Sequence, residues 1–160
     1  RSSRPSAAAV RRQLVAAGMD DEVLVLENGS GLSRRERVTA RMMGQMLVKA
    51  WNSPFQAAFV DSLPIAGTDG TLKKRFTRVG SSLRLKTGTL QDVRALAGFR
   101  LPERPNEPVL AVVVLVNSPR AAAYLPDLDS LVKSLLLSDG GLEIAPLTPT
   151  FTSSTRKAQP

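Results

Sequence analysis

Apolar residues recur every three to four positions in three stretches of the chain, the spacing of one helix face. The first stretch predicts a helix over 7–17 that Gly18 ends, because glycine is common just past a helix C-terminus. In the third stretch, which runs from Leu128 to Leu135, the preceding Pro126 suits the first turn of a helix. The stretches contain Val10, Leu14 and Ala17; Met43, Met46, Leu47 and Ala50; and Leu128, Leu131, Val132 and Leu135.

The second helix has two possible starts. Ser33 and Glu36 fit a capping box, in which each side chain caps the other's backbone N–H. Thr39 fits a simple N-cap and directly precedes the periodic run, so we favour it. The helix should end before Pro54, which can open a short helix through Val60.

Strand patterns follow in the second half of the chain. Residues 83–86 and 93–99 alternate between apolar and other side chains, and a short strand is also expected at 23–26. The continuous apolar run 110–116 predicts a central strand buried on both faces. Short connections, such as the turn or loop 102–108, make an antiparallel three-stranded meander the expected sheet. With helices covering its faces, the fold class is α/β (α+β).

Length and composition indicate one domain. The chain has 160 residues, and we expect residues 1–140 to form the domain. Residues 141–160 are rich in Pro, Thr and Ser and are expected to be a mobile tail. The apolar run 109–116 is too short to cross a bilayer, so no transmembrane segment is predicted.

The charge is strongly positive, with 22 basic and 14 acidic residues giving +8. Nucleic acid is nevertheless not an expected partner, because aromatic residues are only 4% of the chain and the basic residues are scattered. Any polyanion, including the cell wall, would be attracted as well. The chain has no cysteine and no histidine, which excludes thiolate catalysis, Ser-His-Asp triads and ordinary zinc sites. We therefore expect no metal and no organic cofactor.

The most informative motif is Lys86-Thr87-Gly88, at the end of an alternating segment. Lys-Thr-Gly is one of three motifs of serine penicillin-recognising enzymes, beside Ser-x-x-Lys and Ser-x-Asn. Taken alone, the tripeptide also fits a strand end that carries a solvated lysine.

Three blocks in the same order strengthen the enzyme interpretation, and together they resemble a known family. They are similar to the class C low-molecular-mass penicillin-binding proteins, the D-Ala-D-Ala carboxypeptidase/endopeptidases of peptidase family S13. The resemblance extends over residues 6–137. The blocks are residues 28–34, 62–72 and 86–99.

The resemblance implies a C-terminal portion of a β-lactamase/transpeptidase-like domain. The implied activity is serine-type hydrolysis of D-Ala-D-Ala peptides, and the implied partners are the peptidoglycan stem peptide and β-lactams. Such a protein works in the periplasm or elsewhere outside the cytoplasmic membrane. Whether carboxypeptidase or endopeptidase activity dominates stays open.

The resemblance also implies roles for seven residues. As catalytic groups, Lys86 supplies a positive charge, Thr87 a hydroxyl donor, Gly88 room for close approach, and Thr89 a backbone N–H for an oxyanion hole. The implied substrate-binding residues are Arg34, Leu90 and Gln91. Arg34 would face the carboxylate of the peptide's diaminopimelate side chain, for which a guanidinium is suited.

The nucleophile motif is missing from its expected place. The two Ser-x-x-Lys matches, Ser130 with Lys133 and Ser154 with Lys157, both follow Lys86 in the chain. No serine is followed two residues later by asparagine. We expect both motifs in a missing N-terminal portion of the same protein, so that this chain alone is inactive. The alternative is a non-catalytic module that binds cell wall or polyanions.

Overall fold

A computed structural model describes residues 3–19, 22–27 and 33–137 of the protein. The predicted tail, residues 141–160, lies outside the described residues. The elements are α1 (Ser3–Ala16), α2 (Ala40–Trp51), α3 (Gln56–Asp61), the 3₁₀ turns η1 (Gly70–Leu72) and η2 (Gly80–Ser82), β1 (Leu83–Thr89), β2 (Val93–Arg100), β3 (Leu110–Asn117) and α4 (Leu125–Leu137).

The three strands form an antiparallel sheet in the order β1-β2-β3, which confirms the predicted meander. The predicted place of residues 110–116 is wrong, because β2 is the central strand and β3 lies at an edge of the described sheet. Most residues of β3 are only partly buried. Its continuous apolar run arises because Val112 packs toward one face of the sheet and Val113 toward the other.

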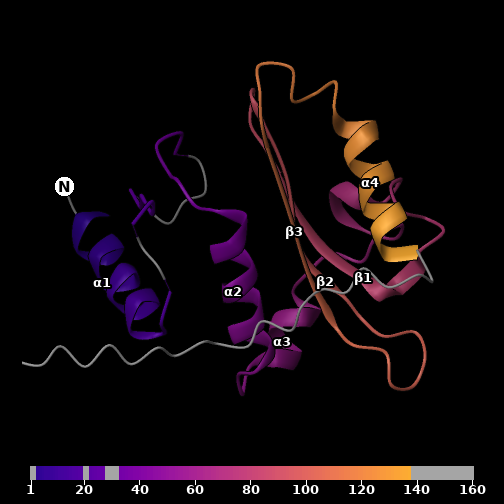
Figure 1. Ribbon diagram of the computed structural model, residues 1–160, viewed down its shortest axis with the longest axis horizontal. Helices are drawn as coiled ribbons and strands as arrows, with labels where there is room; N and C mark the ends of the chain where they lie inside the picture. Colours follow the sequence, from indigo (N-terminus) through magenta and orange to yellow (C-terminus); the bar gives the residue numbers. More distant parts are fainter. Residues whose placement is uncertain (1–2, 20–21, 28–32, 138–160) are drawn as a thin grey trace, which may run out of the picture.

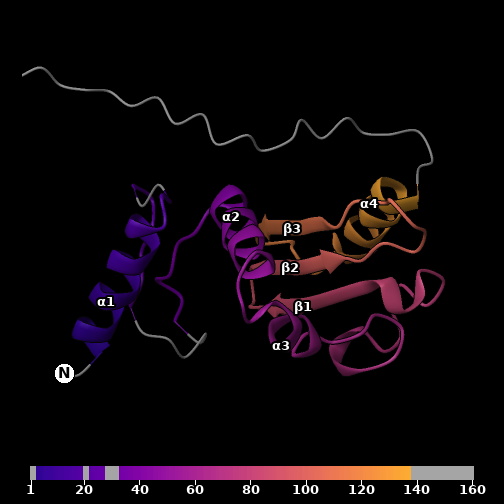
Figure 2. The ribbon, with the colours of Figure 1, turned by 90° about the horizontal axis from the view of Figure 1, so that it is seen from below.

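Helices cover the two faces of the sheet, with α2 and α3 on one side and α4 on the other (Figures 1 and 2). On the α4 face, Leu85 and Leu96 pack in a buried cluster with Leu128 and Val132 of the helix. On the α2 face, Phe99 lies 5.4 Å from the Trp51 ring, centroid to centroid. The sheet is therefore the middle of three layers, and each strand alternates its side chains between two environments.

Two predicted helix ends are confirmed. Thr39 caps α2, since its hydroxyl accepts a hydrogen bond from the Met42 N–H at 3.1 Å. Gly18 ends α1 in the left-handed conformation, and the N–H of Met19 reaches back to the carbonyl of Leu14 at 3.1 Å. This pattern of bonds is a Schellman motif. Ser33 is not the N-cap of α2, because the helix begins at Ala40; its hydroxyl donates to the carboxylate of Glu27 instead.

Two other predictions need correction. The segment 23–26 is not a strand but makes a single bridge, between Val25 and Arg37. In α4, Leu128 and Val132 are buried as expected, whereas Leu131 and Leu135 are exposed. The helix meets the sheet along a narrower stripe than its apolar pattern predicted.

The β2–β3 connection is a fixed loop at the end of the sheet away from the Lys-Thr-Gly motif. Arg100 pairs with the carboxylate of Glu107 at 3.0 Å, and the N–H of Glu103 donates to the same carboxylate at 3.0 Å. The backbone donor, followed by the arginine charge, holds the pKa of Glu107 below its ordinary value. The predicted loop 102–108 is therefore ordered by its own charges.

Gly98 allows β1 and β2 to lie unusually close. A Cβ atom at this position would lie 2.0 Å from the carbonyl oxygen of Arg84 and 3.0 Å from the Cα of Leu85. Both atoms belong to the backbone of β1, so no side-chain rotation relieves the clash. The pairing that positions the Lys-Thr-Gly motif thus depends on the missing side chain.

We therefore expect Gly98→Ala to lower the free energy of unfolding by about 3 kcal/mol, because the two strands must separate. The measurement is urea unfolding of the isolated chain followed by circular dichroism. Gly44→Ala is the matched control, since nothing lies within 4 Å of the added Cβ. In the interior of α2 it should stabilise the chain by up to about 1 kcal/mol. Equal stability of Gly98→Ala and the native chain would refute the close-approach argument.

Candidate functional site

The motif Lys86-Thr87-Gly88-Thr89 lies within β1 rather than after it. The strand continues to Thr89, which pairs with Arg94 of β2. Because successive residues of a strand point to opposite faces, Lys86 and Gly88 face the α2 side while Thr87 and Thr89 face the α4 side. The packing of Leu83 and Leu85 against α4 fixes this phase.

Lys86 is exposed and makes no ion pair within the described part of the chain. Its ammonium donates to the carbonyl of Thr87 at 2.8 Å. Neighbouring positions on this face are small: Ala97 pairs with Lys86, and a Cβ on Gly88 would lie 3.2 Å from that of Ala95. A positive charge therefore stands over a surface that large groups can approach.

The outer edge of β1 is paired along its first half only. The Ala66 N–H donates to the Leu83 carbonyl at 2.9 Å, and the Leu85 N–H donates to the Pro64 carbonyl at 3.0 Å. From Lys86 onward, no bridge to another described segment covers this edge. The backbone groups of the motif are therefore available to an added extended chain.

On the α4 side, a cavity of about 320 Å³ lies beside the motif. Thr87 shares a hydrogen bond of 2.5 Å with the hydroxyl of Thr71, so the 3₁₀ turn η1 touches the strand there. Arg75 also lines the cavity, and its guanidinium binds the Asp129 carboxylate of α4 through two nitrogens. The lining residues are Thr71, Arg75, Thr87, Gly88, Thr89, Arg94, Ala95, Leu125 and Leu128.

Leu90 and Gln91 lie at the tip of the β1–β2 hairpin, next to the motif. The Leu90 N–H donates to the Val93 carbonyl at 3.1 Å, and the Ser118 N–H donates to the Asp92 carbonyl at 2.8 Å. Leu90 is half-buried and Gln91 is exposed. The tip is thus attached to the segment that leads from β3 to α4 (Figure 1).

Arg34 is not brought into contact with β1. It is exposed, and its carbonyl accepts a hydrogen bond of 2.8 Å from the Arg37 guanidinium. The connection between α1 and α2, in which it lies, is on the same side of the sheet as α2 (Figures 1 and 2). Among the described residues, no hydrogen bond, ion pair or cavity joins it to the motif.

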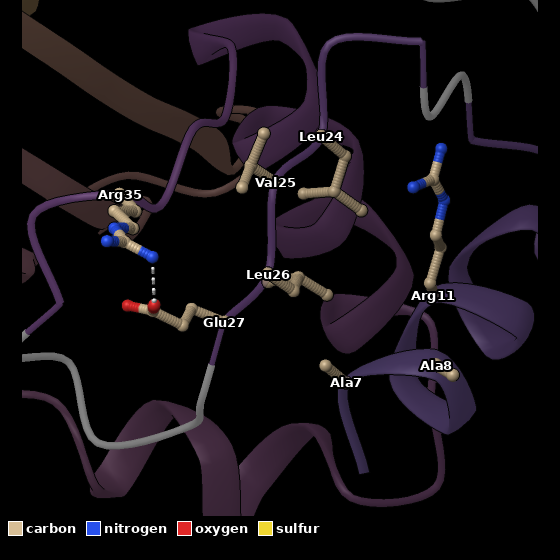
Figure 3. Close-up of a pocket in the computed structure, with 8 residues that line it drawn as sticks. All are labelled: Ala7, Ala8, Arg11, Leu24, Val25, Leu26, Glu27 and Arg35. Atoms are coloured by element: carbon tan, nitrogen blue, oxygen red, sulfur yellow. Dashed lines mark hydrogen bonds and ion pairs between the residues drawn. The ribbon is translucent and has the colours of Figure 1, made fainter. Parts of the chain in front are cut away.

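A larger cavity, of about 520 Å³, holds none of the predicted site residues (Figure 3). It lies between α1, which contributes Ala7, Ala8 and Arg11, and the segment 24–27. Arg35 pairs with Glu27 at 3.2 Å on its wall. Its lining of alanines and aliphatic side chains, with the Arg35–Glu27 ion pair, offers no hydroxyl or thiol nucleophile, so we assign no chemistry to it.

The described Ser-x-x-Lys match lies on α4, and neither of its residues lines the cavity beside the motif. Ser130 is exposed, and the Lys133 ammonium lies 5.8 Å from the centroid of the Phe76 ring. The second match, Ser154 with Lys157, lies outside the described residues. In the described part of the chain, no three acidic, histidine or cysteine side chains gather to hold a metal ion. No described helix has the length and apolarity to cross a membrane.

Sequence reasoning missed three polar residues of the cavity: Thr71, Arg75 and Arg94. Thr71 and Arg75 come from a loop whose fold the pattern did not predict. Arg94 carried a weak signal, because strand alternation and a short hairpin place it on the same face as Thr89.

The curated proteins to which this chain is similar include two bacterial carboxypeptidases. The D-alanyl-D-alanine carboxypeptidase of Actinomadura sp. is 38% identical over 97 residues, covering 56% of this chain and 18% of that protein. Carboxypeptidase DacB of Mycolicibacterium smegmatis is 39% identical over 99 residues, covering 57% and 22%. The chain therefore spans about a fifth of the length of the curated relatives it matches.

Solved structures agree with the fold. Penicillin binding protein 4 (dacB) from Haemophilus influenzae, solved with a β-lactam, matches with a TM-score of 0.56 at 30% identity. The match covers 69% of this chain and 26% of that one. A predatory endopeptidase from Bdellovibrio bacteriovorus, solved with an immunity protein, matches with a TM-score of 0.60 at 20% identity, covering 81% and 35%. This second likeness concerns the fold alone.

The family comparison covers most of the chain. Residues 1–131 match the model of the D-Ala-D-Ala carboxypeptidase 3 (S13) family. The matched range includes the Lys-Thr-Gly motif, both sides of the sheet and most of α4. The chain belongs to the D-Ala-D-Ala carboxypeptidase 3 (S13) family.

Proposed function

We propose that this chain supplies the Lys-Thr-Gly strand of a serine-type D-Ala-D-Ala carboxypeptidase/endopeptidase that acts on peptidoglycan stem peptides and is acylated by β-lactams. Residues 1–140 would form the C-terminal part of its transpeptidase-like domain, and the protein would work outside the cytoplasmic membrane. The observation that carries this proposal is the half-open edge of β1, beside an exposed Lys86 that forms no ion pair with a described carboxylate.

The open edge suits an extended peptide that ends in a carboxylate. Lys86 attracts that anion and biases proton transfers beside the attacking serine. Thr87 offers a hydroxyl donor, although its bond to Thr71 must exchange for a bond to the substrate. The N–H of Thr89 would stabilise negative charge on the attacked oxygen, as one half of an oxyanion hole. Gly88 and Ala95 leave room for the element that carries the serine.

Recognition of the substrate side chain would involve the hairpin tip and Arg34. Leu90 and Gln91 adjoin Thr89 at the hairpin tip and would line the pocket beyond the oxyanion position. Arg34 would bind the side-chain carboxylate from the α2 side of the sheet. The support for Arg34 is its family motif and its exposure, since no described contact links it to β1.

The serine nucleophile would come from a part of the protein outside these 160 residues. The isolated chain should therefore not be acylated by a fluorescent penicillin, while the complete protein should be labelled at a serine that this chain lacks. Gel fluorescence and intact mass measure both. Competition with unlabelled penicillin controls for non-specific attachment. Stoichiometric labelling of the isolated chain would overturn the proposal.

In the complete protein, Lys86→Ala should slow acylation by about 100-fold or more, because the variant removes a fixed charge from a site where charge develops. The measurement is the second-order rate of labelling by the same penicillin. Lys49→Ala removes an exposed lysine of α2 and should leave the rate unchanged. A near-normal rate for Lys86→Ala would remove this lysine from the site.

The second candidate function, a module that binds polyanions, is favoured by one surface segment. Lys73, Lys74 and Arg78 are all exposed within six residues, because the buried Phe76 anchors the segment between them. This candidate predicts that the isolated chain binds an anionic cell-wall polymer and that the affinity falls steeply with added salt. Isothermal titration at two salt concentrations measures this. If the folded chain does not bind such a polymer, this candidate is overturned and only the enzyme proposal remains.

A further inference from the structure

The β1–β2 hairpin does not close by its own backbone alone. Tight hairpin turns use residues with positive φ, usually Gly or Asn. Neither Gln91 nor Asp92 is of these types, and neither has a positive φ. The Leu90 N–H bonds the Val93 carbonyl, but no backbone donor reaches the Leu90 carbonyl among the described residues. The connection therefore needs another donor to satisfy this carbonyl.

The guanidinium of Arg94 is that donor. Its Nη1 atom donates to the Leu90 carbonyl and, at 2.8 Å, to the Val93 carbonyl. One side-chain nitrogen thus joins the residue that leaves β1 to the residue that enters β2. A guanidinium suits this task because it is planar and carries several donors in a fixed arrangement.

The position of Arg94 connects the hairpin tip with the proposed site. Its backbone pairs with Thr89, whose N–H is the proposed oxyanion donor. Its side chain lines the cavity of about 320 Å³ beside Thr87 and Thr89. Unlike Arg75, which Asp129 neutralises, Arg94 makes no ion pair with a described residue. Its hydrogen bonds go to the backbone of the tip.

We propose that Arg94 is a positioning residue, whose guanidinium holds the Leu90–Val93 tip so that the Thr89 N–H and the side chain of Leu90 keep their places beside the substrate. It acts through the backbone and does not touch the reacting atoms. The inference rests on the proposed function, but the hydrogen bonds from the Arg94 guanidinium to the Leu90 and Val93 carbonyls can be tested separately.

The first experiment uses amide hydrogen exchange in the complete protein to measure how often the hairpin tip opens. Arg94→Gln should accelerate exchange of the Leu90 amide at least tenfold, because the tip opens more often. Arg104→Gln is the matched control at the opposite end of the sheet and should leave this amide unchanged. Unchanged exchange in a folded Arg94→Gln protein would overturn the inference, whatever the enzyme does.

The second experiment measures acylation by a labelled penicillin in the same proteins. Arg94→Gln should lower the acylation rate by roughly tenfold to a hundredfold, since small displacements of catalytic groups have effects of this size. Arg94→Lys should retain more activity, and millimolar guanidinium should partly restore Arg94→Ala. Loss of stability alone would not respond to guanidinium in this way.

The outcomes separate the two proposals. If the native protein is not acylated at all, the proposed function fails, and the positioning role of Arg94 in acylation fails with it. If the native protein is acylated and Arg94→Gln reacts at the native rate, only the role of Arg94 is overturned. A slower Arg94→Gln that guanidinium does not restore in Arg94→Ala also contradicts the positioning role.

Discussion

The close pairing of β1 with β2 is the constraint on which the rest of this structure depends. At Gly98 the two backbones approach so closely that no side chain fits between them. The resulting register places Thr89 opposite Arg94 and Lys86 opposite Ala97. A shift of one residue would exchange the faces of the sheet, turning Lys86 into the apolar cluster under α4. The orientation of the motif and the packing of the core are therefore fixed by the same contact.

The edge of β1 combines two functions along its length. Its first half is closed by the segment around Pro64 and Ala66, which anchors the strand. Its second half carries the motif, and its outer edge makes no backbone bridge to a described segment. Open strand edges favour association with other chains, so proteins normally cover or shorten them. An edge that stays open only beside Lys86 is consistent with recognition of an extended peptide.

Much of the fold could be predicted because its signals are local. Gly18 and Thr39 end and start helices through backbone hydrogen bonds within a few residues, and alternation located β1 and β2. The edge position of β3 could not be predicted in this way. An apolar run reports that both faces are covered, as they are at Val112 and Val113, and says nothing about the number of neighbouring strands.

The same difference between local and tertiary signals decides which site residues could be predicted. The motif residues in β1 follow from the sequence, because a strand fixes which face each side chain takes. Thr71 and Arg75 do not, since they reach the strand from a loop whose path depends on tertiary contacts with Thr87 and Asp129. The family resemblance predicted Arg34 as a substrate-binding residue. A sequence motif does not say how far a residue lies from the site, and no described contact joins Arg34 to β1.

The two arginines of the cavity illustrate why charge alone does not identify a functional residue. Arg75 is bound to Asp129, so its charge is compensated and it mainly ties the 3₁₀ region to α4. Among the described residues, Arg94 hydrogen-bonds two carbonyl oxygens through its Nη1 atom, and these carbonyls do not cancel its charge. Its net charge therefore remains beside Thr87 and Thr89 in the cavity. The partner of each guanidinium, rather than its position in the sequence, decides whether its charge is compensated.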